Sequence, residues 1–132
     1  MKEISVPSTK RVEVFDITAQ VQELLPKDLE GFCVVFCPHC SASVLVGDTS
    51  EHLDEDYEQM GAQIYKEYGP YKHFAHGDPN AEGHIFGLLH GCTVLVPVEK
   101  GKIRVGTNQK IIFFEASGPR ADRKIWVDWL RK

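Results

Sequence analysis

Three side chains are suited to holding a divalent metal ion: His39, Glu82 and His84. Imidazole and carboxylate ligands suit zinc, manganese or iron, and three of them leave a position for water or substrate. On a helix, residues two apart point roughly 200° apart, so Glu82 and His84 converge only if loop or strand backbone surrounds Gly83. The alternative is that His84 is a hydrogen-bonded interior histidine and Glu82 a solvated carboxylate. Further donors that could supplement the set are Cys40, His73 and His76.

A Cys-x-x-Cys motif, Cys37-Pro38-His39-Cys40, follows an apolar segment and matches the active site of oxidising thioredoxin-fold disulfide oxidoreductases. In that fold, the first cysteine begins a helix whose dipole lowers the thiol pKa. The segment from Ser41 to Gly47 has β-branched residues in alternation, at Val44 and Val46, and ends in glycine, which does not indicate a long helix. A zinc knuckle would need a second cysteine pair, which is absent. We therefore expect neither a reactive Cys37 thiolate nor a Cys37–Cys40 disulfide, and Cys33 is expected to pack as a small hydrophobic side chain.

Three polar residues could orient a ligand: Asn80, Gln109 and Arg120. The planar guanidinium of Arg120 could bind a carboxylate or phosphate, or could instead form a salt bridge with Glu115 that holds a loop between two strands. The amides of Asn80 and Gln109 could bind a ligand or cap backbone groups.

The elements that must position these residues are short. Strands and helices follow one another in the order ββα, ββα, βββ, which indicates an α+β domain with a largely antiparallel or mixed sheet and two to three helices. Lys2 to Val6 and Lys10 to Ile17 are predicted to pair through the turn at Pro7-Ser8-Thr9, and Gly31 to Cys37 to form a strand buried on both faces. The other predicted strands are Ser43–Val46, Cys92–Val98, Ile103–Gly106, Lys110–Glu115 and Arg123–Leu130. The predicted helices are Ile17–Leu25, Leu53–Tyr68 and Asn80–His90, with Tyr71–Pro79 as a loop near the site.

Two tryptophans, Trp126 and Trp129, lie three residues apart on the last predicted strand. At that spacing they face opposite sides of the sheet, so one is expected in the core and the other at a subunit contact.

Length and composition limit the class of protein. The chain has 132 residues, 42% of them hydrophobic and 26% charged, which is typical of one globular domain over residues 1–132. A net charge of −4 without a basic block argues against a nucleic-acid partner. No apolar segment has membrane-span length, the N-terminus lacks the apolar core of a secretory signal, and the cysteines are expected to be reduced thiols in the cytoplasm.

Four motifs give the chain a resemblance to a known family. They are Asn-Ala-Glu-Gly-His at 80–84, a Val-Pro-Val strand that leads into Gly-Thr-Asn-Gln at 106–109, Glu-Ala-Ser-Gly-Pro-Arg at 115–120, and His-Cys-Ser at 39–41. In this order and spacing they resemble the YjbQ-like family, also known as secondary thiamine-phosphate synthases. That family typically has Asn-Ala-His-Ala-His, Gly-Thr-Trp-Gln, Glu-x-Asp-Gly-Pro-Arg and a His-Thr-Thr element. The resemblance covers roughly residues 31–130.

The departures from the family pattern fall inside these motifs. Glu82 replaces the first histidine of its pair, Asn108 replaces tryptophan and Ser117 replaces aspartate, while Cys40 and Ser41 replace threonines. Because the framework glycines, Pro119 and Arg120 are retained, the pattern indicates altered or lost chemistry on an unchanged fold.

The resemblance implies a small cytoplasmic α+β subunit that assembles as a trimer, with the histidine motifs converging on a pocket. It also implies a transferase that makes thiamine phosphate, in which Arg120 holds phosphate and His39 or His84 acts as acid, base or metal ligand, with Glu115 as a further catalytic candidate. The ligand is then a small phosphorylated or anionic molecule. A non-catalytic ligand-binding or assembly protein with a degenerate site is the main alternative, and a thiol–disulfide oxidoreductase is the third.

Overall fold

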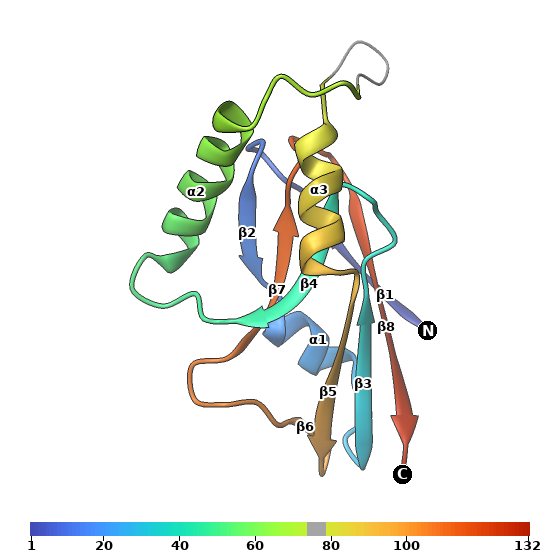
Figure 1. Ribbon diagram of the computed structural model, residues 1–132. Coiled ribbons are helices and arrows are strands. Elements are labelled where there is room, and N and C mark those ends of the chain that lie inside the picture. Colours follow the sequence, from blue (N-terminus) through green and yellow to red (C-terminus); the bar gives the residue numbers. More distant parts are fainter. Residues whose placement is uncertain (74–78) are drawn as a thin grey trace.

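A computed structural model describes residues 1–73 and 79–132 of the chain (Figure 1). His76 therefore lies outside the described residues. Within the described residues, eight strands and three helices occur in the order β1, β2, α1, β3, β4, α2, α3, β5, β6, β7 and β8. The strands are β1 Lys2–Val6, β2 Glu13–Asp16, β3 Gly31–Phe36, β4 Ala42–Gly47, β5 Thr93–Glu99, β6 Lys102–Ile103, β7 Lys110–Glu115 and β8 Arg123–Arg131; the helices are α1 Thr18–Leu24, α2 Leu53–Glu67 and α3 Ala81–His90. The α+β class is confirmed, and the helix predicted at Asn80–His90 is present as α3, whereas the strand predicted at Ile103–Gly106 is only the two-residue β6.

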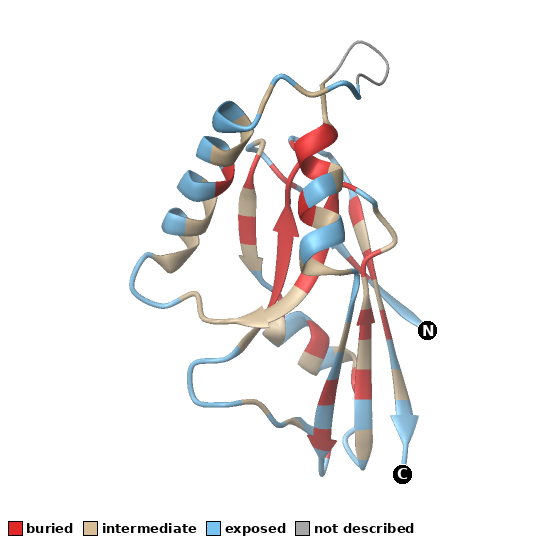
Figure 2. Cartoon of the chain, viewed as in Figure 1, coloured by how far each residue is buried: buried red, intermediate tan, exposed pale blue. Residues whose placement is uncertain are grey.

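Two antiparallel sheets pack face to face. The first has the strand order β1-β8-β3-β5-β6 and the second β2-β7-β4. Alternate residues of each strand point between the sheets, as expected from the period of two. On the first sheet these include Val35 and Ile125, and on the second Val44 and Phe113, all of them fully buried (Figure 2). The main core therefore lies between the two sheets, where Val21 of α1 joins it.

The predicted pairing of the first two strands is wrong. β1 pairs with β8 in the first sheet, whereas β2 pairs with β7 in the second. The connection at Pro7-Ser8-Thr9 is therefore a crossover between sheets and not a hairpin turn. It is held by the 115–120 turn, since the Ser8 amide donates to the Arg120 carbonyl at 2.8 Å.

Helices α2 and α3 cover the outer face of the three-stranded sheet (Figure 1). Phe86 of α3 and Ile64 of α2 pack there against Ile112 and Phe114, in a second apolar cluster. The molecule thus has three layers: two helices, a three-stranded sheet and a five-stranded sheet. None of the helices in the described part of the chain is long and apolar enough to cross a membrane.

The central strand β3 is covered on one face only, contrary to the prediction. Cys33 and Val35 are fully buried against the core, whereas Phe32, Val34 and Phe36 point the other way and remain partly exposed. The reason is that β3 runs antiparallel to both of its neighbours in a sheet with a single covered face. The two tryptophans lie on opposite faces as predicted: Trp129 packs against the core and Trp126 lies on the outer face.

Candidate functional site

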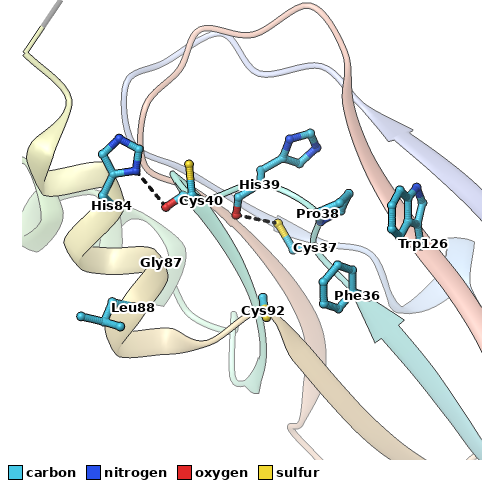
Figure 3. A pocket seen from close by; sticks show the side chains of 10 residues that line it. All are labelled: Phe36, Cys37, Pro38, His39, Cys40, His84, Gly87, Leu88, Cys92 and Trp126. Carbon is cyan, nitrogen blue, oxygen red and sulfur yellow. Dashed lines mark hydrogen bonds between the residues drawn. The ribbon is translucent and has the colours of Figure 1, made fainter. Parts of the chain in front are cut away.

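A cavity of about 580 Å³ lies where the end of β3, the segment that follows it and α3 meet (Figure 3). Both His39 and His84 line it, so the structure brings these two predicted site residues to one place. The remaining lining residues are Phe36, Cys37, Pro38, Cys40, Gly87, Leu88, Cys92 and Trp126. Most of this wall is apolar or sulfur-bearing, so the two imidazoles are its principal acid–base groups.

His39 is fixed against β8. Its Nε2 atom lies 3.0 Å from the carbonyl oxygen and 3.1 Å from the amide nitrogen of Lys124. Burial lowers the pKa of His39, and the positive charge of Arg123 lowers it further. The ring is therefore neutral at physiological pH, which is the form that accepts a proton.

His84 comes from α3. Its Nδ1 atom lies 3.3 Å from the Cys40 carbonyl oxygen, and its ring makes an edge-to-face contact with His73 at 4.9 Å between centroids. The helix reaches this segment because Gly87 has no side chain: a Cβ atom there would lie 2.6 Å from the Cys40 carbonyl oxygen. Gly87, although glycine is a poor helix former, is thus the residue that allows α3 to form one wall of the cavity.

An aromatic pair forms another part of the wall. The rings of Phe36 and Trp126 stack at 5.7 Å with an interplanar angle of 22°, and the Trp126 indole N–H donates to Glu3 at 3.2 Å. Neighbouring strands place them together, since Phe36 of β3 is the register partner of Trp126 on β8. The pair offers a flat apolar surface to a bound molecule.

The cysteines of the Cys-x-x-Cys motif are not arranged for thioredoxin-like chemistry. The chain continues from Cys40 into strand β4 and not into a helix, so Cys37 does not stand at the start of a helix. Burial raises the pKa of the Cys37 thiol to about 11, whereas Cys40 and Cys92 are exposed. Burial likewise raises the pKa of Cys33 to about 11, and this residue packs in the core as predicted.

The structure does not bring Glu82 to the two histidines. Residues 81–90 form a helix, so Glu82 and His84 diverge; Glu82 is 1% exposed and forms an ion pair of 2.5 Å with Arg11. Across residues 1–73 and 79–132, no group of three or more His, Cys, Asp and Glu side chains is placed to hold a metal ion. The residues present therefore do not fit the three-ligand site, and no chemistry is assigned to a metal here.

Glu115 lies in the core beside the cavity and not in its wall. Its carboxylate accepts two hydrogen bonds of 2.7 Å from Arg123, one from Ser8 and one from the Ser117 amide. Burial opposes ionisation, but the hydrogen bonds from Arg123 and Ser117 hold the pKa of Glu115 below its usual value. The predicted partner, Arg120, is not the one observed. A carboxylate at the end of an apolar strand signals the need for a buried cation, but not which arginine supplies it.

The three predicted ligand-orienting residues lie outside the cavity wall. Arg120 is exposed; its Nε donates to the Ser117 carbonyl at 2.9 Å, and its charge contributes to lowering the pKa of His39. Asn80 immediately precedes α3 without capping it through its side chain. Gln109 accepts a 2.8 Å hydrogen bond from the Gly106 amide and so closes a turn.

Comparison with known proteins points to one family, UPF0047. The sequence profile described as "UPF0047 protein YjbQ-like" matches residues 2–132. A UPF0047 protein of Archaeoglobus fulgidus is 36% identical over 123 residues, which is 93% of this chain and 96% of that protein. The UPF0047 protein YugU of Bacillus subtilis is 31% identical, over 91% of this chain and 92% of its own length.

Solved structures also match this chain over nearly its whole length. The crystal structure of protein APE1520 from Aeropyrum pernix K1 matches with a TM-score of 0.89 at 32% identity, over 99% of this chain and 98% of that one. A YbjQ-like protein of unknown function from Sulfolobus solfataricus P2 matches with a TM-score of 0.89 at 30% identity, over 99% and 96% of the two chains. The resemblance carried by the four sequence motifs is thereby confirmed, and the chain belongs to the YjbQ-like UPF0047 family.

Proposed function

We propose that this protein binds a small phosphorylated or anionic molecule with a planar ring in the cavity between β3 and α3. One observation carries the proposal: His39 and His84 line the same cavity as the stacked Phe36–Trp126 pair. Such a cavity combines a flat apolar surface with two imidazole side chains, whose ring nitrogens donate or accept hydrogen bonds. The exposed guanidinium of Arg120, whose charge contributes to lowering the pKa of His39, is the candidate anion-binding group, although it lies outside the cavity wall.

The reaction that the family resemblance implies is condensation to thiamine phosphate. The thiazole nitrogen would form a bond to the methylene carbon of the aminopyrimidine, and diphosphate would leave. In this proposal His39, neutral and fixed by Lys124, is the acid–base group, His84 the second one, and Arg120 holds a phosphate. No metal ion has a part in this scheme.

The test is an incubation of the purified protein with aminopyrimidine diphosphate and thiazole phosphate, with and without added divalent metal. Formation of thiamine phosphate that is lost in His39→Ala supports the synthase. If the parent protein forms no more thiamine phosphate than His39→Ala, the synthase proposal is wrong and ligand binding remains as the proposal.

Ligand binding without catalysis is the second candidate. It is favoured by Glu82, which stands in place of the family's first histidine and is committed to Arg11. Calorimetry with thiazole phosphate separates this candidate from an inert protein. Leu88→Trp, which fills the cavity, should abolish binding, whereas Leu89→Trp on the same helix but outside the lining residues should not.

We also infer a homo-oligomer, a trimer by family resemblance. The outer face of the five-stranded sheet supports this: Phe32, Leu95 and Leu130 there are 38%, 55% and 57% exposed. They adjoin one another, because Phe32 pairs with Leu130 and Val34 with Leu95. Light scattering should show an oligomer that Leu95→Asp dissociates and that Leu89→Asp, at a position 72% exposed on α3, leaves intact. A stable monomer at micromolar concentration would contradict the inference.

A further inference from the structure

A second cavity, of about 580 Å³, lies where the turn between β5 and β6 packs against α1 and the segment that follows it. It shares no lining residue with the histidine cavity. Its wall includes three lysines, Lys27, Lys100 and Lys102, and one carboxylate, that of Glu23. The chain as a whole has a net charge of −4, so this lysine cavity concentrates positive charge in an acidic protein.

The two-residue turn between β5 and β6 brings the lysines together. Lys100 and Gly101 have φ angles of 50° and 70°, the left-handed values that a tight hairpin turn requires at both central positions. A Cβ atom on Gly101 would clash with the carbonyl oxygen of Lys27, so the turn packs directly on the backbone of the third lysine. Lys100 and Lys102, on either side of Gly101, are thereby held next to Lys27.

The side chain of Gln22 on α1 holds this turn in place. Its Nε2 atom donates to the Gly101 carbonyl oxygen at 2.7 Å, and its Oε1 atom accepts from the Ile103 amide at 3.0 Å. The Gly101 amide donates in addition to the Leu29 carbonyl oxygen at 2.9 Å. Three hydrogen bonds therefore fix the turn against α1 and the following segment, so the lysine cavity is formed before any ligand arrives.

The three lysines of the cavity are not neutralised by the protein. Within residues 1–73 and 79–132, none of them forms an ion pair, and neither does Glu23. The lining side chains thus carry three positive charges and one negative charge. Like charges that the backbone holds close together repel one another, and a bound anion relieves this repulsion.

Two further carboxylates near the turn are engaged elsewhere. Asp28 pairs with Arg131 at 3.2 Å. Glu30 accepts a hydrogen bond of 2.9 Å from the Lys100 amide, and it lines a different cavity together with Arg104 and Lys132. Neither carboxylate lines the lysine cavity, so both leave its excess of positive charge in place.

We propose that the lysine cavity binds a small molecule through two or three linked phosphate groups. Each lysine ammonium group has three donors that can point in several directions, which suits the many oxygens of a diphosphate or triphosphate. The three lysines are exposed, so their side chains can reach a ligand without leaving a buried position. An anion with a single charge would offset only part of the repulsion and should bind more weakly.

The experiment is isothermal titration calorimetry of the whole protein at low salt with inorganic triphosphate, diphosphate and orthophosphate. Triphosphate should bind saturably, at least about tenfold more tightly than orthophosphate. Added salt should weaken the binding, because it screens the lysine charges. ATP identifies the source of the phosphate groups: tighter binding than triphosphate assigns the site to a nucleotide, and weaker binding assigns it to free polyphosphate.

Charge-changing variants locate the binding. Lys102→Glu should abolish it, and Lys27→Ala and Lys100→Ala should each weaken it several-fold. Glu23→Gln removes the one negative charge from the wall and should tighten binding several-fold. Lys2→Glu makes the same charge change at an exposed residue outside the lining, so it is the matched control for Lys102→Glu and should bind as the parent protein does.

Three results would overturn the proposal. The first is that neither triphosphate nor diphosphate binds the parent protein saturably at low salt. The second is that Lys2→Glu weakens binding as much as Lys102→Glu, which would mean that only the overall charge matters. The third is that Leu88→Trp, which fills the histidine cavity, abolishes triphosphate binding, since the phosphates would then lie in that cavity. Failure of the proposed function leaves all three measurements unaffected.

Discussion

The Nε2 atom of His39 faces both the amide nitrogen and the carbonyl oxygen of Lys124, at 3.1 and 3.0 Å. A neutral ring makes one of these two hydrogen bonds in each tautomer: Nε2–H donates to the carbonyl, and Nε2 without hydrogen accepts from the amide. In a protonated ring Nε2 always carries a hydrogen, so it donates to the carbonyl and cannot accept from the amide. The hydrogen bond with the backbone of Lys124 raises the pKa of His39, but burial and the charge of Arg123 lower it by more, so the neutral ring is favoured.

Stability should therefore depend on pH through His39 and His90. Burial is the first cause of a lowered pKa for both, with Arg123 adding to it for His39. A lowered histidine pKa means that the unfolded chain binds more protons, so the stability is present above pH 6.5 and is lost as the pH falls through the lower folded values. The measurement is the free energy of unfolding from urea titrations between neutral and mildly acidic pH.

Substitution of each histidine shows whether it causes the pH dependence. His39→Gln and His90→Gln should each reduce the slope of unfolding free energy against pH, by up to about 1.4 kcal/mol per pH unit at the steepest point. His52 is the control, because its hydrogen bond to Glu55 raises its pKa and its contribution has the opposite sign. If the double variant His39→Gln/His90→Gln loses unfolding free energy with falling pH as steeply as the parent protein, other groups cause the loss.

Thiol reactivity should divide the cysteines into two pairs. Cys40 and Cys92 are exposed, while Cys33 and Cys37 are buried with pKa values raised to about 11. Iodoacetamide at pH 8, followed by mass spectrometry, should label the exposed pair rapidly and the buried pair only after unfolding. A reversible Cys37–Cys40 disulfide, with insulin-disulfide turnover lost in Cys37→Ser, would restore the oxidoreductase hypothesis.

Gly87→Ala should destabilise the protein although alanine is the better helix former. Helix propensity alone favours alanine by about 1 kcal/mol, but the new Cβ would meet the Cys40 carbonyl oxygen, a backbone atom, at 2.6 Å. We expect a net loss of about 1–3 kcal/mol in the free energy of unfolding and weaker ligand binding. Gly61→Ala in α2 is the matched variant: its Cβ would lie 3.0 Å from a side-chain methyl of Val12, which has more room to move. Equal effects of the two substitutions would argue against a tight contact at Gly87.

The Glu115–Arg123 pair should be costly to break. Arg123→Met leaves a buried carboxylate with only Ser8 and the Ser117 amide as donors, and we expect a loss of about 3–5 kcal/mol. Arg131→Met removes an exposed pair with Asp28, which solvent screens, and should change stability far less. Chemical denaturation of both variants measures their losses of unfolding free energy. Equal losses would contradict the prediction.

The sequence predicted local elements better than their partners. Helix α2 follows from the apolar spacing of Leu53, Tyr57 and Ile64, which is a local property. The pairing of β1 with β8 brings together residues more than a hundred positions apart, and nothing in the Pro7-Ser8-Thr9 segment distinguishes a crossover from a turn.

The candidate site was predictable in part for the same reason. The family motifs pointed to His39 and His84, and the structure places both in one cavity. The aromatic wall was not anticipated, because Phe36 and Trp126 meet only through the register of β3 against β8. Glu82 was misplaced because its direction depends on Gly83 continuing the helix, which its own propensity disfavours.

The position of β8 between β1 and β3 sets an order for folding during synthesis. While the ribosome is still making β8, β1 has no neighbour in its sheet, and β3 can pair only with β5. The backbone groups that later face β8 stay unsatisfied by protein, and the apolar side chains of both strands stay exposed. The nascent chain therefore presents unpaired strand edges until β8 has left the exit tunnel, and its five-stranded sheet closes only then.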